Sequence, residues 1–419
     1  MYLELEPVDT LFFRDGRPMQ AGAGSGGHGA NWPLPTVLHE ALRSALLRLS
    51  GDRRSPRKTV PGRRRRGSKH PKTIAFVTRD YESLRLVGPL PLRDRTLYLP
   101  TPGDVVRTEE GHLSVLAPLA NAPARSNFPC PWLEPVAGTV RSGKRSPPAW
   151  IPAGEFSSLT QASGRLDQKF AELTLWQTEH RVGIGVDPTT GAAAKGKLYT
   201  AEHLRMVGGT SLWLEAELSA GDTALSQDRK GIESLPGSDL TLGGEGRLCR
   251  IRRSHQPWPE VPAPPVSSQR LKWVLVTPAV FTGGWRPNWV DVRDGRVLLK
   301  KGETARRAEE DRLSWRQRVR QLPSISARLV AVCCGKPHAF SGWDLAAQTQ
   351  EGSVPGAPKR TLLAVPAGSV YYFEADTRED ARALAAALHG RRRSDYFGEK
   401  GMGFGFCGLW EWLRLQAPS

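Results

Sequence analysis

Three glycines near the C-terminal end, Gly403, Gly405 and Gly408, have the G-x-G-x-x-G spacing of a dinucleotide-binding loop. Such a loop follows a strand, opens a long helix and precedes an acidic residue about 20 positions further on. The sequence from Gly408 to Ser419 offers neither the helix nor the acidic residue. We therefore expect these glycines to serve a purpose other than dinucleotide binding.

Metal and redox chemistry have little support in the residue pattern. The five cysteines, at positions 130, 249, 333, 334 and 407, form no C-x-x-C pair. The sequence also has no H-x-E motif and no cluster of aspartates that could bind a metal ion. We expect the adjacent Cys333 and Cys334 to be buried as small hydrophobic residues. An odd cysteine count without a disulfide framework suits a reducing cytoplasm. The N-terminal residues predict a strand and not a signal peptide, and no apolar run approaches the ~18 residues of a membrane span.

The strongest compositional signal is a net charge of +17 over 419 residues. Residues 53–72 contain ten lysines and arginines and no acidic residue, and without them 49 basic residues face 42 acidic ones. Such a run cannot fold alone, because its charges repel and it buries no apolar surface. It is either a solvated loop or a flexible arm that binds a polyanion, with an affinity that depends strongly on salt.

The first half of the chain predicts a series of strands around one helix. Alternation in 2–8 predicts a strand, with Leu3 and Leu5 on one face, and apolar spacing in 36–49 predicts an amphipathic helix that Thr36 could cap. Further expected elements are short strands at 84–87, 96–99 and 113–116, a helix at 168–177, a β-hairpin at 180–200, a strand at 211–219 and a basic strand at the end of 241–253.

Residues 257–268 are rich in proline and form the best candidate for a linker between domains. The second half then predicts strands at 271–281, 326–334 and 369–375, a charged helix within 304–322, and a helix at 378–389 that stops at Gly390. A chain of this length suggests two or three domains. Strand, helix and further strands in each half predict an α+β fold of two βαββαβ domains with insertions, 1–256 and 269–419.

Several segments, in order along nearly the whole chain, resemble the third subunit of the Cmr effector complex of type III-B CRISPR systems, a family within the RAMP superfamily. No single motif is specific, but the ordered set is. The basic stretch 53–72 does not belong to this pattern. The segments that carry the resemblance are LEPVDTLFFRDGRP (5–18), GPLPL and YLPTPGDVV (88–106), EHRVGIGVDPTTGAAAKGKLYTAEHLR (179–205), LGGEGR (242–247), VLVTPAVFTGGWRP (274–287), SGWDL (341–345), VPAGSVYYFE (365–374) and KGMGFGFCGLW (400–410).

The resemblance implies two ferredoxin-like domains packed together, with a protruding β-hairpin. It implies a non-catalytic subunit that binds the 5′ repeat-derived tag of CRISPR RNA in antiviral defence. Its partners would be the CRISPR RNA, the large polymerase-like subunit and the first backbone subunit of the complex, with target RNA contacted only indirectly. Neither a cofactor nor a metal is implied.

The hairpin and the glycine-rich loop provide most of the candidate RNA contacts. The hairpin at 180–200 is similar to the thumb that such subunits place against guide RNA, and Arg181, Lys195 and Lys197 suit phosphate contacts, which position RNA without reading its sequence. The alternative is an ordinary basic surface hairpin. In the loop 400–408, glycines let backbone N–H groups approach phosphates closely. Phe404 and Phe406 either stack on bases or, as we expect, pack in the core; the candidate residues of this loop are Lys400, Gly401, Gly403 and Gly405.

The remaining candidates lie near the N-terminus and in the 242–247 motif. Arg14 and Arg17 flank an Asp-Gly turn, and His28 lies in the glycine-rich loop that leads into the first helix, where backbone amides favour an anion. Arg43 on the polar side of that helix is a further candidate or a plain solvent-facing arginine. Arg247 either forms a structural ion pair with Glu245 or faces RNA.

An enzyme is the alternative interpretation, because other RAMP proteins cut precursor CRISPR RNA with a histidine general base. His28 and His39 are the histidines that such a reaction could use. Acid–base cleavage also needs the base within hydrogen-bond reach of the 2′-hydroxyl, usually with a second acid or cation nearby. The sequence shows no such constellation, so we predict no catalytic residue.

Overall fold

The computed structural model describes residues 1–14, 30–51, 81–122, 130–161, 164–166, 173–187, 189–218, 231–265, 268–307, 310–344 and 357–414. The basic stretch 53–72, Arg17 and His28 lie outside these residues, so their predicted roles stay predictions.

The chain forms two compact units that are discontinuous in sequence. Unit 1 comprises residues 1–89, 174–255 and 338–363, and unit 2 comprises residues 90–173, 256–337 and 364–419. Each unit therefore collects segments from both halves of the chain. The domain division at 257–268 stays a prediction.

An antiparallel sheet forms the centre of unit 1. Its first strand, β1 (Tyr2–Pro7), pairs with β12 (Thr210–Glu217) on one side and β14 (Leu248–Arg253) on the other. The strand β13 (Asp239–Thr241) extends the sheet beyond β14, and β2 (Arg85–Arg93), which passes into unit 2 after Pro89, extends it beyond β12. The strands β1, β12 and β14 confirm the predicted strands near 2–8, 211–219 and 241–253.

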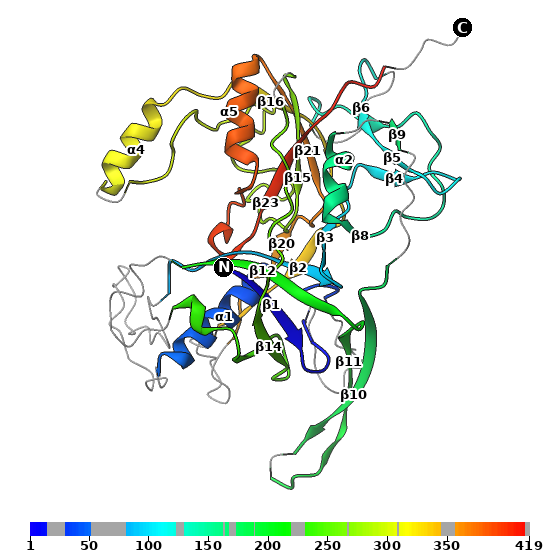
Figure 1. Cartoon of the computed structure of the whole chain (residues 1–419), viewed down its shortest axis with the longest axis vertical. Helices are drawn as coiled ribbons and strands as arrows, with labels where there is room; N and C mark the ends of the chain where they lie inside the picture. The colour runs from blue at the N-terminus through cyan, green and yellow to red at the C-terminus, as the bar shows by residue number, and fades with distance from the viewer. Residues whose placement is uncertain are drawn as a thin grey trace. The chain divides into compact units, whose positions relative to one another are not determined.

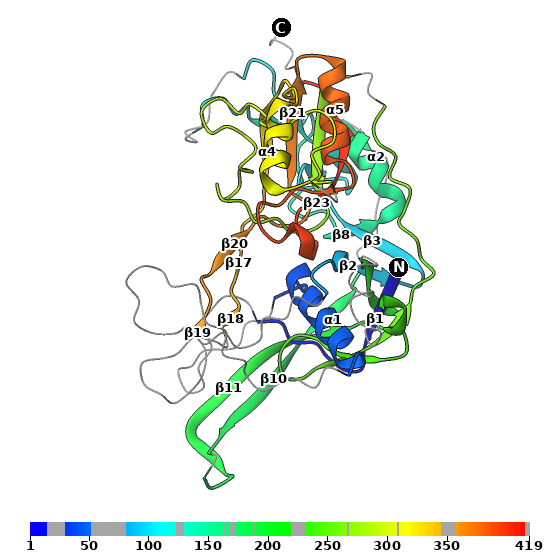
Figure 2. The ribbon, with the colours of Figure 1, turned by 90° about the vertical axis from the view of Figure 1, so that its left-hand side faces the viewer.

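The helix α1 (Pro35–Leu49) confirms the predicted amphipathic helix and packs on this sheet (Figure 2). Leu38, Leu42 and Leu46 are fully buried with Leu3 and Leu5 of β1, because they repeat on one helix face. Thr36 does not cap the helix. Leu34 is the capping residue and Pro35 occupies the first turn, where its preset φ and missing N–H fit.

A long β-hairpin extends from unit 1 (Figure 1). It consists of β10 (Trp176–Val186) and β11 (Ala193–Met206), paired from Trp176 opposite Met206 outwards, and it confirms the predicted hairpin. The helix predicted at 168–177 is wrong at its described end, since Trp176 and Gln177 belong to β10. Contacts with a distant part of the chain favour the strand here, because the ring centroids of Trp176 and Trp32 lie 4.7 Å apart.

Unit 2 contains a second antiparallel sheet with the strand order β16-β21-β15-β23-β22. The helix α5 packs on it, and Leu384 of α5 is buried with Trp273, Tyr371 and Phe373 of the sheet. Gly390, with a φ of +63°, follows the end of the helix as predicted. The bounds are β15 (Arg270–Leu275), β16 (Ala327–Cys333), β21 (Val370–Ala375), α5 (Arg378–Leu388), β22 (Arg391–Arg392) and β23 (Phe404–Leu409).

The remaining elements are short. Unit 2 also holds β3 (Thr96–Pro100), β4 (Val105–Arg107), β5 (Leu113–Val115), β6 (Ala117–Pro118), β7 (Val136–Ala137), β8 (Trp150–Pro152), η1 (Ala153–Glu155), α2 (Phe156–Gln161), β9 (Gly164–Leu166), α4 (Arg312–Gln321) and η3 (Gly398–Lys400). Unit 1 also holds η2 (Ile232–Ser234), β17 (His338–Phe340), β18 (Trp343–Asp344) and β19 (Ala357–Pro358), and β20 (Leu362–Ala364) ends at the boundary.

The architecture is a mixed fold with antiparallel sheets and few helices, which confirms the α+β class. In each unit, the sheet strand that is earliest in the sequence lies between two strands that come later in the sequence. β1 lies between β14 and β12, and β15 lies between β21 and β23, an order compatible with the βαββαβ pattern. Two complete ferredoxin-like domains stay a prediction. The expected burial of the adjacent cysteines is wrong for Cys334, which is exposed at the end of β16, while Cys333 is partly buried.

Candidate nucleic-acid interface

The part of the β10–β11 hairpin next to its tip has an apolar, exposed face. Directly paired residues of antiparallel strands point to the same side, so Val182, Ile184 and Leu198 share one face. Val182 is 68% exposed, Ile184 53%, Val186 57% and Leu198 59%. Scattered apolar surface residues are normal, but three on one face of a projecting hairpin, with Val186 exposed further along β10, offer an apolar surface for bases or for another protein chain.

The opposite face is lined by an aromatic ring and a lysine that lie over glycines. A Cβ on Gly183 would meet the Tyr199 ring at 2.3 Å, and one on Gly185 would meet the Lys197 side chain at 2.8 Å. The two glycines therefore let Tyr199 and Lys197 lie flat across the neighbouring strand.

The tip of the hairpin is a turn organised by Asp187. Its carboxylate accepts hydrogen bonds from the backbone N–H groups of Thr189 (2.8 Å) and Thr190 (3.2 Å), and these bonds lower the pKa of Asp187. Lys195 and Lys197 follow the turn and are exposed. No partner for either lysine lies within the described residues, so their ammonium groups are available to an anion.

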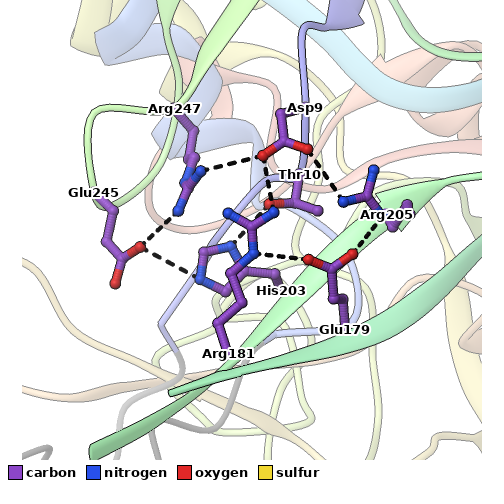
Figure 3. Close-up of polar contacts among 8 residues, drawn as sticks. All are labelled: Asp9, Thr10, Glu179, Arg181, His203, Arg205, Glu245 and Arg247. Atoms are coloured by element: carbon purple, nitrogen blue, oxygen red, sulfur yellow. Dashed lines mark hydrogen bonds and ion pairs between the residues drawn. The ribbon is translucent and has the colours of Figure 1, made fainter. Parts of the chain in front are cut away.

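The base of the hairpin is fixed by a network of charged side chains (Figure 3). The Asp9 carboxylate, just after β1, accepts hydrogen bonds from Arg181 of β10 (2.8 Å) and Arg205 of β11 (3.1 Å), and pairs with Arg247 at 3.4 Å. Glu179 of β10 accepts hydrogen bonds from Arg181 at 2.7 Å and from Arg205. The network thus links both strands of the hairpin to the chain between β1 and α1 and to the turn before β14.

The arginines keep both central carboxylates ionised. Hydrogen bonding to Arg181 above all lowers the pKa of Asp9 to about 2, and hydrogen bonds from Arg205 and then Arg181 lower the pKa of Glu179 to about 2. Both carboxylates are partly exposed, so solvent screens the pairs and each contributes modestly to stability.

His203 forms the buried part of this network. Its side chain is fully buried and stacks on Phe12 with ring centroids 5.0 Å apart. Its Nδ1 lies 3.0 Å from the Thr10 hydroxyl oxygen, and its Nε2 lies 3.4 Å from a Glu245 carboxylate oxygen. Burial lowers the pKa of His203, which favours the neutral ring at physiological pH.

The glycine-rich segment is part of the core of unit 2. Residues 401–408 are all buried, and the last five lie in β23. A Cβ on Gly405 would lie 2.5 Å from both Trp273 Nε1 and the Val274 carbonyl oxygen. Gly401 and Gly403 have φ values of +95° and +71°, which favour glycine. Close packing and turn geometry therefore explain these glycines, and no long helix follows them in the described residues.

Phe404 and Phe406 pack in the core, as predicted, and each is 7% exposed. The Phe404 ring stacks on Trp258 at 5.2 Å, and Phe406 lies 5.2 Å from the His389 ring. Neither ring is free to stack on a base in this arrangement.

A family model described as "CRISPR-associated protein (Cas_Cmr3)" matches residues 3–412. The chain belongs to this family. The predicted membership of the Cmr subunit 3 family is thereby confirmed.

Solved structures of related complexes also resemble this Cas_Cmr3 family member, at low similarity. A chain of a "Type III-B Cmr-beta bound to cognate target RNA and AMPPnP" has a TM-score of 0.43 and 12% identity, with 89% of this chain and 86% of that chain covered. A chain of a "Csm3-Csm4 subcomplex in the type III-A CRISPR-Cas interference complex" has a TM-score of 0.33 and 11% identity, with 90% and 94% covered. No curated protein sequence matches.

The structure brings two of the predicted RNA-binding residues of this Cas_Cmr3 family member together. Arg181 and Arg247 both bind Asp9, and Arg247 also donates a hydrogen bond to Glu245 at 2.9 Å. The structural ion pair that the sequence left open for Arg247 is therefore present. Arg205, which completes the network, was not among the predicted residues. The usable signal was its place in the hairpin, opposite Gln177 and diagonal to Glu179.

The other predicted residues lie apart. Arg14 is exposed after β1, and Arg43 is half-buried on α1. The Lys400 ammonium lies 5.7 Å from the centroid of the Phe397 ring. His39 is buried, with Nε2 3.2 Å from the Leu84 carbonyl oxygen, which gives it a structural partner. The RNA contacts assigned to Arg14, Arg43 and Lys400 stay predictions, whereas His39 was named only as a candidate base for the alternative enzyme.

Among the described residues, no group of three or more histidines, cysteines and acidic residues is arranged to bind a metal ion. No helix among them is long and apolar enough to span a membrane.

Proposed function

We propose that the chain is a non-catalytic, cytoplasmic subunit of a type III-B CRISPR effector complex in antiviral defence. It binds the 5′ repeat-derived tag of CRISPR RNA and bridges the large polymerase-like subunit to the first backbone subunit. Its two ferredoxin-like domains carry the RNA on basic loops and on the β10–β11 hairpin. Membership of the Cas_Cmr3 family supports this proposal over nearly the whole chain.

The observation that carries the proposal is the hairpin itself. Its base is anchored by the Asp9 network, whereas Lys195 and Lys197 beyond it are exposed and have no partner in the described residues. A rigidly anchored element with free cations can place an RNA backbone without reading its sequence. The exposed apolar face with Val182 and Ile184 provides a surface on which an unstacked base can lie.

Tag recognition is tested by the binding of the purified chain, alone and with its large partner, to CRISPR RNAs with intact, scrambled or deleted 5′ tags at two salt concentrations. We expect the tightest binding to the intact tag at both salt concentrations. Equal binding to all three RNAs that collapses at high salt would refute tag recognition and assign the binding to charge alone.

The role of the hairpin is tested by Lys195→Gln together with Lys197→Gln. The matched control is Lys336→Gln with Lys359→Gln, two exposed lysines whose ammonium groups have no partner in the described residues. We expect each lost phosphate contact to weaken binding and to reduce the salt dependence, with a slope change of about 0.7 per contact for single-stranded RNA. An equal effect of the control pair would contradict a specific role for the hairpin.

The non-catalytic assignment has a separate test. Labelled precursor CRISPR RNA incubated with the chain should stay intact, with or without metal ions. Metal-independent cleavage that disappears in the His28→Ala variant would overturn the assignment and favour an endoribonuclease.

A further inference from the structure

The helix α4 of unit 2 exposes an unusual row of arginines. Arg312, Arg316 and Arg320 repeat every four residues and therefore lie along one side of the helix. All three are exposed, and none has a partner within the described residues. With a rise of about 1.5 Å per residue, the row extends over about 12 Å.

The opposite side of α4 attaches the helix to the preceding segment. The Trp315 indole N–H donates a hydrogen bond to the Thr304 carbonyl at 2.9 Å. The Arg318 guanidinium donates to both Glu310 carboxylate oxygens, at 2.7 and 2.9 Å, and to the Glu303 and Ala305 carbonyls, each at 2.7 Å. The Arg318 guanidinium is thus engaged in hydrogen bonds within unit 2, while those of the three arginines of the row are not.

The two described acidic residues next to the helix are also engaged, so neither of them neutralises the row. Glu310 binds Arg318, and Asp311 caps the helix by accepting hydrogen bonds from the N–H groups of Leu313 (2.7 Å) and Ser314 (3.1 Å). The helix itself contains no acidic residue. None of its residues is buried, and Figure 1 shows α4 standing apart from the sheet of unit 2.

We propose that α4 is an additional RNA-binding surface, on which Arg312, Arg316 and Arg320 contact the phosphate backbone without reading its sequence. Three evenly spaced cations in a line are complementary to a polymer with regularly spaced negative charges. Guanidinium groups bind phosphate oxygens through two parallel hydrogen bonds, which favours arginine over lysine in such a row. The net charge of +17 directs the chain as a whole towards a polyanion.

This surface goes beyond the tag site, and its test does not depend on tag recognition. The probe is a labelled single-stranded RNA of mixed sequence that lacks the tag, titrated with the full chain over a series of salt concentrations. The variant carries Arg312→Gln, Arg316→Gln and Arg320→Gln. The control carries Arg141→Gln, Arg378→Gln and Arg382→Gln, which removes the same charge from exposed positions elsewhere in unit 2.

We expect the α4 variant to bind at least about tenfold more weakly near 0.1 M salt, and its slope of log K against log salt to be less steep by about 2. The control should retain most of its affinity. Crosslinks from thiouridine-substituted RNA should map to the peptide that contains 312–320 in the unmodified chain. The variant should melt at an unchanged temperature, because no residue of the row is buried.

Three results would overturn the proposal. Equal losses in the variant and the control would show that only the total charge matters. An unchanged salt slope in the variant would show that the row makes no phosphate contact. Retained RNA binding together with loss of another subunit from the purified complex would assign α4 to an acidic protein surface. A chain that fails to discriminate tags but passes this test would refute tag recognition and leave the α4 proposal standing.

Discussion

A buried ion pair in unit 2 gives the sharpest stability prediction. Lys272 of β15 is 1% exposed and Asp104 is fully buried, and the lysine ammonium donates a hydrogen bond to Asp104 Oδ2 at 2.7 Å. The same oxygen accepts a hydrogen bond from the Tyr372 hydroxyl at 2.8 Å, and the ammonium also donates to the Leu159 carbonyl at 3.2 Å. Four segments of the chain, namely β15, β21, α2 and the residue before β4, therefore meet at one pair of charges.

The perturbation is Lys272→Met, which keeps much of the side-chain volume and removes the charge. It leaves the Asp104 carboxylate buried with the Tyr372 hydroxyl as its remaining side-chain donor among the described residues. Breaking one partner of a buried pair costs about 3–5 kcal/mol, because the other charge is left uncompensated. For a domain of this size class, about 2–4 °C per kcal/mol predicts a fall in melting temperature of about 6–20 °C.

The assay is urea unfolding followed by tryptophan fluorescence, together with thermal melting. The control Lys300→Met removes a partly exposed lysine whose ammonium donates to the Ser324 hydroxyl at 3.0 Å, and it should change stability by less than about 0.5 kcal/mol. The double variant Lys272→Met with Asp104→Leu should be more stable than Lys272→Met alone, since replacing both charges by apolar groups is often neutral. A cost below about 1 kcal/mol for Lys272→Met, or additive costs in the double-mutant cycle, would refute the reasoning.

Three further predictions concern the hairpin and the glycine-rich segment. Because the pKa values of Asp9 and Glu179 are about 2 in the folded chain and about 4 when unfolded, the stabilisation from both carboxylates should be complete above about pH 5 and lost as the pH falls from about 4 to about 2. The hydrogen-exchange protection factors at the hairpin base, which are corrected for the intrinsic exchange rate at each pH, should fall over this range, and less so in an Asp9→Asn variant. Gly405→Ala should cost about 1–3 kcal/mol of unfolding free energy, because its Cβ would meet Trp273, whereas Gly154→Ala, with no atom within 4 Å, should be close to neutral in the same urea titration. Shortening residues 188–196 should weaken RNA placement or complex assembly but leave the melting temperature unchanged, and an unchanged RNA affinity and assembly profile would contradict a role for the tip.

The elements that the sequence predicted well are those with local causes. The helix α1 follows from apolar residues that repeat at helical spacing, and the strands β1 and β12 follow from apolar residues that alternate with polar ones. Both patterns can be read from a few neighbouring residues. The hairpin at 180–200 was predictable for the same reason, since a turn between two β-type runs is a short-range feature. The segment 168–177 also predicted a helix, but at its described end Trp176 pairs with Met206 in the sheet ladder instead.

The pairing of Arg181 and Arg247 with Asp9 could not be predicted from the sequence. Arg181 and Arg247 were chosen as RNA contacts, but each binds Asp9, which lies 172 positions from Arg181 and 238 from Arg247. Nothing in the residues near either arginine indicates that partner. In the sequence, the two lysines of the hairpin tip and these arginines are all basic residues, and none of them is indicated as a partner for Asp9. Only the structure distinguishes the side chains that are paired from those whose charge has no partner among the described residues.

By itself, the sequence determined the positions of most helices and strands, the excess of positive charge and the family, because apolar periodicity, composition and motif order are properties of the linear chain. The tertiary structure alone decided that 401–408 is buried, that Lys272 and Asp104 form an internal pair, and that the row on α4 has no acidic partner among the described residues. Burial and ion pairing depend on which distant segments meet, and that choice is made by the packing of the whole fold.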